Sequence, residues 1–377
     1  MGNIIKMHIM VASRKFGGVV GGVERMAITL MNEMVSRGHR VSLFTWDDDG
    51  DAESFYQLDK NINWIKLVMG NPAEKAGLIL RLRRMMRVRD ILRKNRPDVI
   101  LAFQEGAFVT LRLYSVFQGI PVICAIRNSP FRDPSIPVSP PDWLTHLVLC
   151  MARLITVQFS RYSVFFPARL AQKFRTIPNH VIPAQSFALP DADVPEKIIL
   201  TTGRLSPEKN QAALVTAFAK IAPDFSDWKL VIVGRGSLEQ DLKQQILTYN
   251  DDIARRIVLA GVSDDVPSWL IRAHIFCLPS WWEGFPNSLA EAMAHGLPCV
   301  GFRDCDGVCD LIDDNVTGLL ADGLKNPDVL AEKLAVLMRS PELRRKMGVA
   351  GFEKTKQYDS AKVFDLWEKT LEEALQI

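Results

Sequence analysis

The feature that most constrains the fold is an alternation of short apolar runs with longer amphipathic segments, which occurs twice along the chain. In the first half, apolar strands are expected at residues 4–12, 39–45, 62–68, 98–103, 120–126 and 154–160, and the last of these is expected between helices at 143–153 and 166–174. In the second half they are expected at 198–202, 230–233, 257–260, 275–278 and 298–302. Such alternation predicts mainly parallel sheets covered by helices. Four prolines between Pro178 and Pro195 separate the two series of alternating strands and helices, so we predict an α/β protein of two domains.

Length and composition agree with this prediction. A chain of 377 residues is too long for one ordinary core, and 48% hydrophobic with 24% charged residues is typical of a soluble globular protein. The six cysteines are scattered, and the pair Cys305 and Cys309 lacks zinc-ligand spacing, so we expect reduced thiols in a cytosolic protein. The apolar run from Trp143 to Phe159 contains charged residues and is too short to span a bilayer. The first residues resemble a buried strand rather than a signal peptide.

The net charge of +3 conceals a difference between the two halves. Residues 1–190 contain 25 Lys and Arg against 14 Asp and Glu, a balance of +11. Residues 191–377 contain 21 against 29, a balance of −8. We therefore expect the first half to meet an anionic partner.

Two carboxylates stand close together in the stretch from Leu278 to Gly296. Pro286 cannot lie inside a helix, so Glu283 is predicted in a loop and Glu291 in the helix that follows. This spacing suits the binding of two ends of one polar ligand. Alternatively, Ser288 and Glu291 form a capping box, and Glu291 only closes a helix end.

A second candidate site follows the strand at 198–202. Ser206 is predicted as an N-cap with Pro207 at the first helical position, which directs free backbone N–H groups toward the preceding loop. Arg204 and Lys209 add two cations. The pattern indicates a diphosphate site, although a capped surface helix with incidental charges would share it.

The segment 74–96 is predicted to be a basic amphipathic helix. It contains nine Lys and Arg residues against two acids, and one face is expected to contain Leu78, Leu82, Met85, Met86 and Leu92. Such a helix can lie on an anionic membrane or bind a phosphate group. The alternative is a helix that covers a sheet and exposes a solvated basic face.

Two further features of the first half are ambiguous. Glycines 17, 18, 21 and 22 follow the first strand and allow close approach to a ligand, but their spacing is not that of a dinucleotide fingerprint. Arg127 and Asn128 follow the strand at 120–126, at the edge of the sheet where ligands commonly bind. A structural arginine in a loop fits the same pattern.

Four motifs together resemble the GT-B glycosyltransferases of family 4. They are GGVERMAITLMNEMVSRGHRV, LTTGRLSPEKN, LVIVGRGSLE, and Glu283 followed after eight residues by Glu291. The resemblance covers nearly the whole chain and implies a retaining, metal-independent enzyme that uses nucleotide sugars. It also implies two Rossmann-like domains facing a central cleft. These would be residues 1–190, which bind the acceptor, and 191–357, which bind the nucleotide sugar, with a C-terminal helix at about 358–377 returning to the first domain.

The resemblance also assigns roles to residues. Arg204 and Lys209 would bind and stabilise the leaving diphosphate, Glu291 would bind the ribose hydroxyls, and Glu283 would approach the hydroxyls of the donor sugar. The other implied donor contacts are Gly21, Gly22, Gly203, Gly234, Val262, Phe285, Pro286 and Asn287, and the region 261–265 would receive the base. Acceptor or lipid-diphosphate contacts would come from Arg127, Asn128, Arg81, Arg84, Arg87 and Arg89. No metal and no cofactor besides the donor is implied. Many relatives have a histidine near the position of Arg127, so the acceptor side departs from the family pattern.

The basic helix resembles one in the branch that extends polyprenyl-diphosphate-linked oligosaccharides at the cytoplasmic membrane face. The expected function is transfer of a hexose or N-acetylhexosamine from a UDP-sugar to a lipid-linked saccharide in surface polysaccharide or glycan assembly. The expected location is peripheral, on the inner face of the cell membrane. The alternatives are a GT-B nucleotide-sugar epimerase or phosphorylase, and a non-catalytic scaffold that binds nucleotide sugars at the membrane. A nucleic-acid partner is not expected, because the basic residues lack interleaved aromatics.

Overall fold

The chain divides into two compact units in the computed structural model, which describes residues 6–19, 21–71, 74, 76–130, 142–324 and 326–376. One unit consists of Met1–His180 and Ala361–Ile377, and the other of Val181–Ser360. The first division therefore follows residue 180, whereas the proline pattern predicts it at 190. The relative arrangement of the two sheets across a cleft stays a prediction.

The first unit contains a seven-stranded parallel sheet. Its order is β3 (Asn63–Lys66), β2 (Arg40–Thr45), β1 (His8–Ser13), β4 (Val99–Phe103), β5 (Val122–Ala125), β6 (Ile155–Val157) and β7 (Phe174–Thr176). The predicted parallel sheet is thus confirmed, although the expected start of the first strand at residue 4 lies outside the described residues. The sequence does not predict β7, because a three-residue strand is too short to show a periodic pattern.

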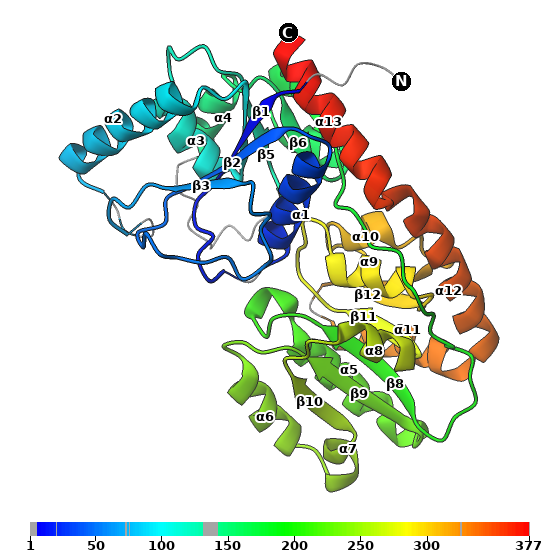
Figure 1. The fold of residues 1–377 in the computed structure, drawn as a ribbon. Helices are drawn as coiled ribbons and strands as arrows, with labels where there is room; N and C mark the ends of the chain where they lie inside the picture. Colours follow the sequence, from blue (N-terminus) through cyan, green and yellow to red (C-terminus); the bar gives the residue numbers. More distant parts are fainter. Residues whose placement is uncertain are drawn as a thin grey trace. The chain divides into compact units, whose positions relative to one another are not determined.

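Helices cover both faces of the first sheet. Figure 1 shows α1 (Gly22–Ser36) and α13 (Ser360–Gln376) on one face, and α2 (Leu78–Asn95), α3 (Glu105–Tyr114) and α4 (Asp142–Leu149) on the other. Ile9 and Val11 of β1 pack toward α1 and α13, while Met10 and Ala12 pack toward α2, α3 and α4. Because side chains alternate across a strand and both faces are covered, the strand is apolar throughout.

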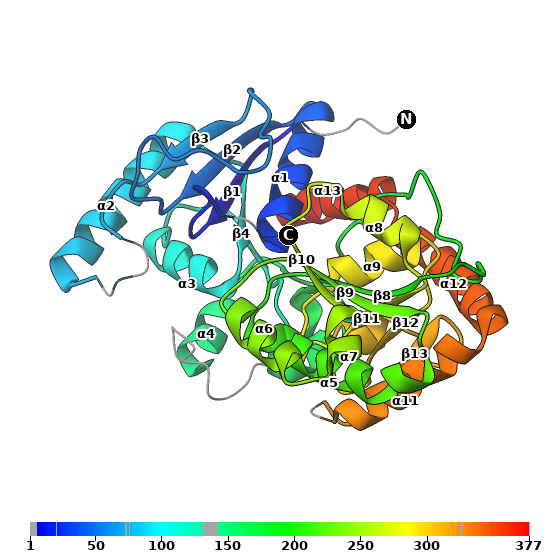
Figure 2. The same ribbon diagram turned by 90° about the horizontal axis from the view of Figure 1, so that it is seen from below.

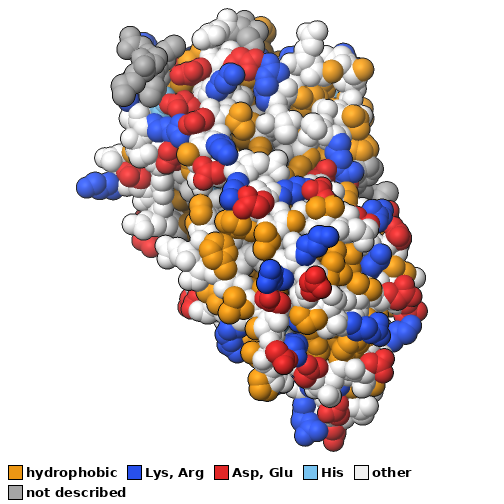
Figure 3. Space-filling view, turned by 90° about the vertical axis from the view of Figure 1, so that its right-hand side faces the viewer, with side chains coloured by type: hydrophobic (Ala, Val, Ile, Leu, Met, Phe, Trp, Pro, Cys, Tyr) orange, Lys and Arg blue, Asp and Glu red, His pale blue; other side chains and the backbone are white. Residues whose placement is uncertain are grey.

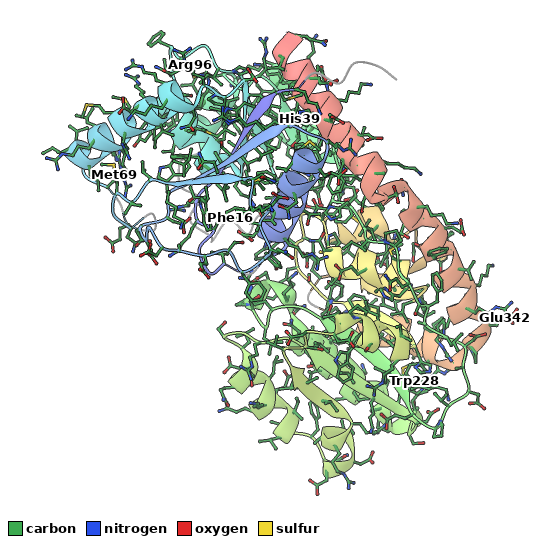
Figure 4. The ribbon with its side chains drawn as sticks, in the orientation of Figure 1. Phe16, His39, Met69, Arg96, Trp228 and Glu342 are labelled. Atoms are coloured by element: carbon green, nitrogen blue, oxygen red, sulfur yellow. The ribbon has the colours of Figure 1, made fainter. Side chains whose placement is uncertain are left out.

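The last helix completes the core of the first unit. Phe364, Trp367 and Leu371 of α13 are buried in the same cluster as the apolar face of α1. The guanidinium of Arg37 donates to Glu368 at 2.7 Å, and the same carboxylate lies 2.8 Å from the ring of His39. Figure 4 shows His39 beside α13.

The second unit contains a six-stranded parallel sheet. Its order is β10 (Ile257–Gly261), β9 (Trp228–Val233), β8 (Lys197–Thr202), β11 (Ile275–Leu278), β12 (Cys299–Phe302) and β13 (Gly318–Ala321). The helices are α5 (Gln211–Ile221), α6 (Glu239–Leu247), α7 (Asp251–Arg255), α8 (Val266–Arg272), α9 (Asn287–Ala294), α10 (Val308–Leu311), α11 (Pro327–Arg339) and α12 (Pro341–Thr355). Figure 2 shows α8 and α9 on one side of this sheet and α5 and α11 on the other.

Two predicted helices of the first unit are shorter or tighter than expected. The helix expected at 143–153 ends at Leu149, and the helix expected at 166–174 is a 3₁₀ segment over Ala168–Lys173. Further 3₁₀ segments occupy Ser160–Phe165, Pro207–Lys209, Ala222–Asp224 and Lys356–Tyr358. Short apolar runs do not distinguish these helix types, so the difference arises only when the segments pack.

Candidate functional site

Glycines bring the loops at the carboxyl edge of the second sheet into direct backbone contact. The N–H of Gly203 donates to the carbonyl of Val233 at 2.9 Å, and the N–H of Gly234 donates to the carbonyl of Gly261 at 2.7 Å. A Cβ atom on Gly234 would lie 1.9 Å from the carbonyl oxygen of Gly203, and its φ is +147°. The close packing of these two loops therefore explains why residue 234 is a glycine.

Lys209 and Glu283 form the centre of this edge. The Nζ atom of Lys209 lies 2.5 Å from Oε1 of Glu283, and the hydroxyl of Ser280 donates to the same oxygen at 2.7 Å. The two charged side chains are only 20% and 11% exposed. Lys209 follows β8 and Glu283 follows β11, and these strands are neighbours in the sheet. The topology thus joins residues that are 74 positions apart in the chain.

The segment that contains Arg204 and Lys209 differs from the predicted capped helix. Pro207–Lys209 is a single 3₁₀ turn, Asn210 follows in the left-handed conformation with a φ of 50°, and α5 begins only at Gln211. The hydroxyl of Ser206 donates to the carboxylate of Glu208 at 2.6 Å and makes no capping bond. The amide of Asn210 donates to the carbonyl of Pro279 at 3.1 Å, which holds a conformation that asparagine tolerates better than most residues.

Arg204 lies at the open side of the same edge. Its side chain is 70% exposed, and its guanidinium is 3.5 Å from the carboxylate of Glu208. Its backbone carbonyl accepts a hydrogen bond from Gln211 at 2.9 Å, which fixes the backbone while the side chain remains accessible. The structure therefore places one accessible cation and one half-enclosed cation, Lys209, on the same short segment.

The Glu283 loop and the helix after it follow the prediction in outline. Glu283 precedes Pro286, and α9 begins at Asn287 and contains Glu291. Pro286 occupies the N-cap position and makes no side-chain capping bond, so the alternative capping box at Ser288 is not formed. Glu291 lies beyond the first turn of α9 and does not serve as its cap.

Neighbouring elements hold this loop firmly. Phe285 is buried, and its ring meets that of Tyr358 edge-on, with centroids 5.4 Å apart. Gly307 has a φ of +74°, and a Cβ atom there would lie 2.9 Å from Cδ of Pro286. The base region expected at 261–265 is more open, since Val262 is exposed and Asp265 caps α8 through the N–H of Ser268 at 3.1 Å.

In the first unit, a buried carboxylate organises the loop after β1. The N–H groups of Phe16 and Gly17 donate to Asp47 at 3.1 and 3.0 Å, and Asp47 is fully buried just after β2. Phe16 lies at the start of this loop in Figure 4. Gly21 is the extended N-cap residue of α1 and Gly22 is the first residue of that helix. Asp47 was not predicted, because nothing in its acidic run of three aspartates distinguishes it from its neighbours.

Arg127 occupies the interior of the first unit. Its guanidinium donates to the carbonyl of Ile177 at 2.6 Å and to the hydroxyl of Thr156 at 2.8 Å, and it lies 4.7 Å from the ring centroid of Trp367. Burial lowers the pKa of Arg127 to about 9. These contacts favour the structural alternative over the predicted acceptor contact.

Asn128 has a different position from its neighbour. It is half-buried, and its side-chain oxygen accepts from the amide of Gln104 at 3.3 Å. Gln104 follows β4 and has a positive φ of 71°. Asn128 follows β5, the neighbouring strand, so two amide side chains meet at the carboxyl edge of this sheet. The sequence identifies Asn128 as a candidate but misses Gln104.

The cations of α2 do not act as one group. Arg84 is buried and donates to the carbonyls of Met69 at 2.7 Å and Gly70 at 3.1 Å, which favours a structural role over the predicted contact with a lipid diphosphate. Arg89 donates to the carbonyl of Tyr114 at 3.0 Å. Arg81 and Arg87 are exposed. Figure 4 shows Met69 and Arg96 near opposite ends of α2. The bonds from Arg84 to the carbonyls of Met69 and Gly70 link the preceding turn to the helix.

The apolar residues of α2 are also divided between two faces. The buried residues of the helix are Arg84, Val88, Ile91 and Leu92, of which the last three join the hydrophobic core on this face of the sheet. Leu78, Leu82 and Met86, which were predicted to share a face with Leu92, are exposed together with Ile79. In the described part of the chain, no helix is long and apolar enough to cross a bilayer.

The chain is a two-domain α/β protein. Each of its units is Rossmann-like and has polar side chains at the carboxyl edge of its parallel sheet. Comparison with known sequences identifies the family. The model for Glycosyltransferase Family 4 matches residues 20–183, and that for Glycosyl transferases group 1 matches residues 186–354. The two matches together cover most of the chain. The protein therefore belongs to the GT-B glycosyltransferases of family 4.

Individual proteins agree with this assignment. An uncharacterized glycosyltransferase of Haemophilus influenzae is 26% identical, covering 94% of this chain and 97% of that protein. A Campylobacter jejuni enzyme is 23% identical over 94% of this chain and 95% of its own length. It is named as an α-1,4-N-acetyl-D-galactosaminyltransferase that acts on a saccharide linked to undecaprenol diphosphate. The structure of Anabaena HepE in complex with UDP has a TM-score of 0.76 at 17% identity and covers 97% of this chain and 100% of its own, which shows the same fold.

Proposed function

We propose that the protein transfers a hexose or N-acetylhexosamine from a UDP-sugar to a polyprenyl-diphosphate-linked saccharide, with retention of configuration and without a metal ion. The observation that carries the proposal is the meeting of Lys209 and Glu283 at the carboxyl edge of the second sheet. The relative from Campylobacter supports a lipid-diphosphate acceptor, because its name specifies one. The UDP bound by HepE supports a uridine nucleotide as the donor group.

The chemistry required at this edge is the stabilisation of a leaving diphosphate. Breaking the bond between an anomeric carbon and a diphosphate builds negative charge on the phosphate oxygens. Preorganised cations oppose this charge where it develops, and they act more strongly where water is partly excluded. Lys209 is half-enclosed and held by Glu283, whereas Arg204 is accessible on the same segment, so the pair can serve this purpose together.

The carboxylates are proposed to recognise the sugar groups of the donor. Glu283 is fixed by Ser280 and Lys209, and it would accept hydrogen bonds from hydroxyls of the transferred sugar. Glu291 in α9 would accept from the ribose hydroxyls. We name no carboxylate nucleophile. In the proposed reaction the acceptor attacks on the same face from which the diphosphate leaves, and that diphosphate helps to take the acceptor's proton.

The exposed face of α2 is proposed to hold the protein at an anionic membrane surface. Leu78, Ile79, Leu82 and Met86 are exposed beside Arg81 and Arg87. A helix that presents apolar and basic side chains together can place the former among acyl chains and the latter at lipid phosphates. This location would bring the enzyme to a lipid-linked acceptor.

A panel of nucleotide sugars tests the donor assignment. The melting temperature of the purified protein is measured with UDP-, GDP- and ADP-sugars, first without added metal and then with EDTA. A ligand that binds only the folded state raises the melting temperature by mass action. We expect a rise with one UDP-sugar that survives EDTA; no rise with any UDP-sugar, or one that EDTA removes, would contradict the donor assignment.

Product analysis separates transfer from the alternatives. The active donor is incubated with a polyprenyl-diphosphate-linked saccharide, and the new glycosidic bond is examined by NMR. An α-linked product from an α-linked donor is expected. Release of a free altered sugar without acceptor would indicate an epimerase, and tight donor binding without turnover would indicate a scaffold.

A further inference from the structure

The first unit contains a cavity at the edge of its sheet opposite to Asn128. The cavity has a volume of about 730 Å³ and lies where β5, β6 and β7 begin. No acidic residue lines it in the described part of the chain. Its lining includes three cations, Arg112, Arg153 and Lys173, and the residues Phe117 and Gly119 of one loop. A cavity of this size can hold a small ligand or a headgroup.

Three cations from three different segments converge on this cavity. Arg112 comes from α3, Arg153 precedes β6 and Lys173 precedes β7. All three are partly buried. Burial lowers the pKa of Lys173, Cys150 raises it, and the positive charges of Arg153 and Arg112 lower it. All three cations line the same cavity, so their like charges repel one another.

The hydrogen bonds of these cations leave their charge uncompensated. The Nε atom of Arg112 donates to the carbonyl of Met151 at 3.1 Å, and that of Arg153 donates to the carbonyl of Ala374 at 3.0 Å. Lys173 donates to two carbonyls, at 2.7 and 2.6 Å. Among the residues that the structure describes, none of the three cations forms an ion pair. These bonds orient the side chains but supply no negative charge.

An apolar side chain stands at the rim of the cavity. Phe117 is 96% exposed and has a φ of 66°, a left-handed conformation that an aromatic residue rarely adopts. Gly119, two residues further on, has a φ of 72° and so lies in the same left-handed region. A ligand that combines an anionic group with an apolar part would contact both the cations and Phe117.

We propose that this cavity binds a phosphate group, carried either by a soluble anion or by a lipid headgroup. A phosphate would offset the repulsion among Arg112, Arg153 and Lys173 and would accept hydrogen bonds from the terminal guanidinium nitrogens. The site lies at the amino edge of the sheet, whereas Asn128 and the loop after β1 lie at the carboxyl edge. The proposal therefore goes beyond the proposed transfer reaction and does not rest on it.

Charge-removing variants test the proposal in two arms. The variants are Arg112→Gln and Arg153→Gln, with Arg112→Lys as a conservative change and Lys346→Gln, an exposed residue of α12, as the matched control. The first arm titrates inorganic phosphate at constant ionic strength by calorimetry. The second measures sedimentation with phosphatidylcholine vesicles that contain phosphatidic acid. Circular dichroism and melting curves establish that each variant is folded.

Each result decides the proposal. Loss of one charge-assisted contact is expected to weaken binding by about tenfold or more. If Arg112→Gln and Arg153→Gln weaken phosphate binding by this factor while Arg112→Lys and Lys346→Gln do not, the cavity binds the free anion. If the same two variants weaken binding only to the vesicles that contain phosphatidic acid, the cavity binds a lipid headgroup. If the folded pocket variants match Lys346→Gln in both arms, the proposal is overturned.

Discussion

Lys209 and Arg204 lie on one short segment but differ in exposure, and their replacement gives the most direct test at the scale of single residues. We expect Lys209→Ala and Arg204→Ala each to lower the turnover of a UDP-sugar by about two to three orders of magnitude, because each removes a cation that is proposed to stabilise the leaving diphosphate. The matched control is Lys220→Ala, an exposed lysine of α5 that pairs with Asp328. Turnover near that of the unmodified protein in either variant would remove the diphosphate assignment.

Asp47 supports a second prediction at this scale. Its two carboxylate oxygens accept from two successive N–H groups, and an amide offers only one acceptor with an N–H₂ group in place of the other. In Asp47→Asn one backbone donor therefore faces another donor, and the loop after β1 should shift. Small displacements of a binding loop can lower rates by up to about a hundredfold.

The control for Asp47 is its neighbour. Asp48→Asn removes the same charge from an exposed position 3.7 Å from Lys15. We expect steady-state turnover to fall at least about tenfold in Asp47→Asn and to change little in Asp48→Asn, with both variants folded by circular dichroism. Equal activities in the two variants would show that the loop does not depend on Asp47.

At the scale of elements, α2 is a helix whose two faces differ in burial. Its buried face includes Arg84, which donates to the turn before the helix. Its outward face presents Leu82 and Met86 to solvent. Transfer of such a side chain from water to an apolar phase is worth about 1.5–3 kcal/mol, so each replacement by serine should weaken vesicle binding about tenfold or more.

Sedimentation with anionic vesicles measures this effect. The variants Leu82→Ser and Met86→Ser are compared with Leu247→Ser, an equally simple change on the exposed surface of α6 in the second unit. We expect the two α2 variants to bind weakly and the α6 variant to bind like the unmodified protein. Binding that is equal in all three would rule out α2 as the membrane contact.

The elements of the site also show which helix boundaries local sequence patterns predict and which they do not. The break at Pro286 correctly predicts Glu283 in a loop and Glu291 in a helix, since proline lacks the N–H that a helix interior needs. The predicted helical turn does begin at Pro207 after Ser206, but it is a single 3₁₀ turn, and the α-helix begins only after Asn210, which adopts a left-handed conformation. That conformation depends on the carbonyl of Pro279, which is distant in sequence.

At the scale of the whole molecule, the last helix is part of the unit formed by the start of the chain. Trp367 of α13 is fully buried in the first unit, whereas its neighbour Leu366 is 42% exposed. We expect Trp367→Ala to lower the free energy of unfolding of the first unit by about 3–5 kcal/mol and Leu366→Ala by less than about 0.5 kcal/mol. Calorimetry with and without UDP can separate the units, since the donor is expected to stabilise the second.

Charged and hydrophobic side chains are mixed on the face of the molecule that Figure 3 draws. Figure 3 shows Lys, Arg, Asp and Glu side chains interspersed over one face of the molecule, with scattered hydrophobic side chains between them. The overall net charge is +3.

If Trp367→Ala left the unfolding of the first unit unchanged, α13 would not contribute to its core as the structure indicates.

The sequence alone determined the two parallel α/β units, the family, and the residues Arg204, Lys209, Glu283 and Glu291 as candidates, because hydrophobic periodicity and motif spacing are local properties of the chain. Only the tertiary structure decided which polar groups meet. It joined Lys209 to Glu283 through neighbouring strands, and it placed Arg127 and Arg84 in the interior. The reason is that burial and hydrogen-bond partners depend on strand order and helix rotation, which are settled by packing between residues far apart in sequence.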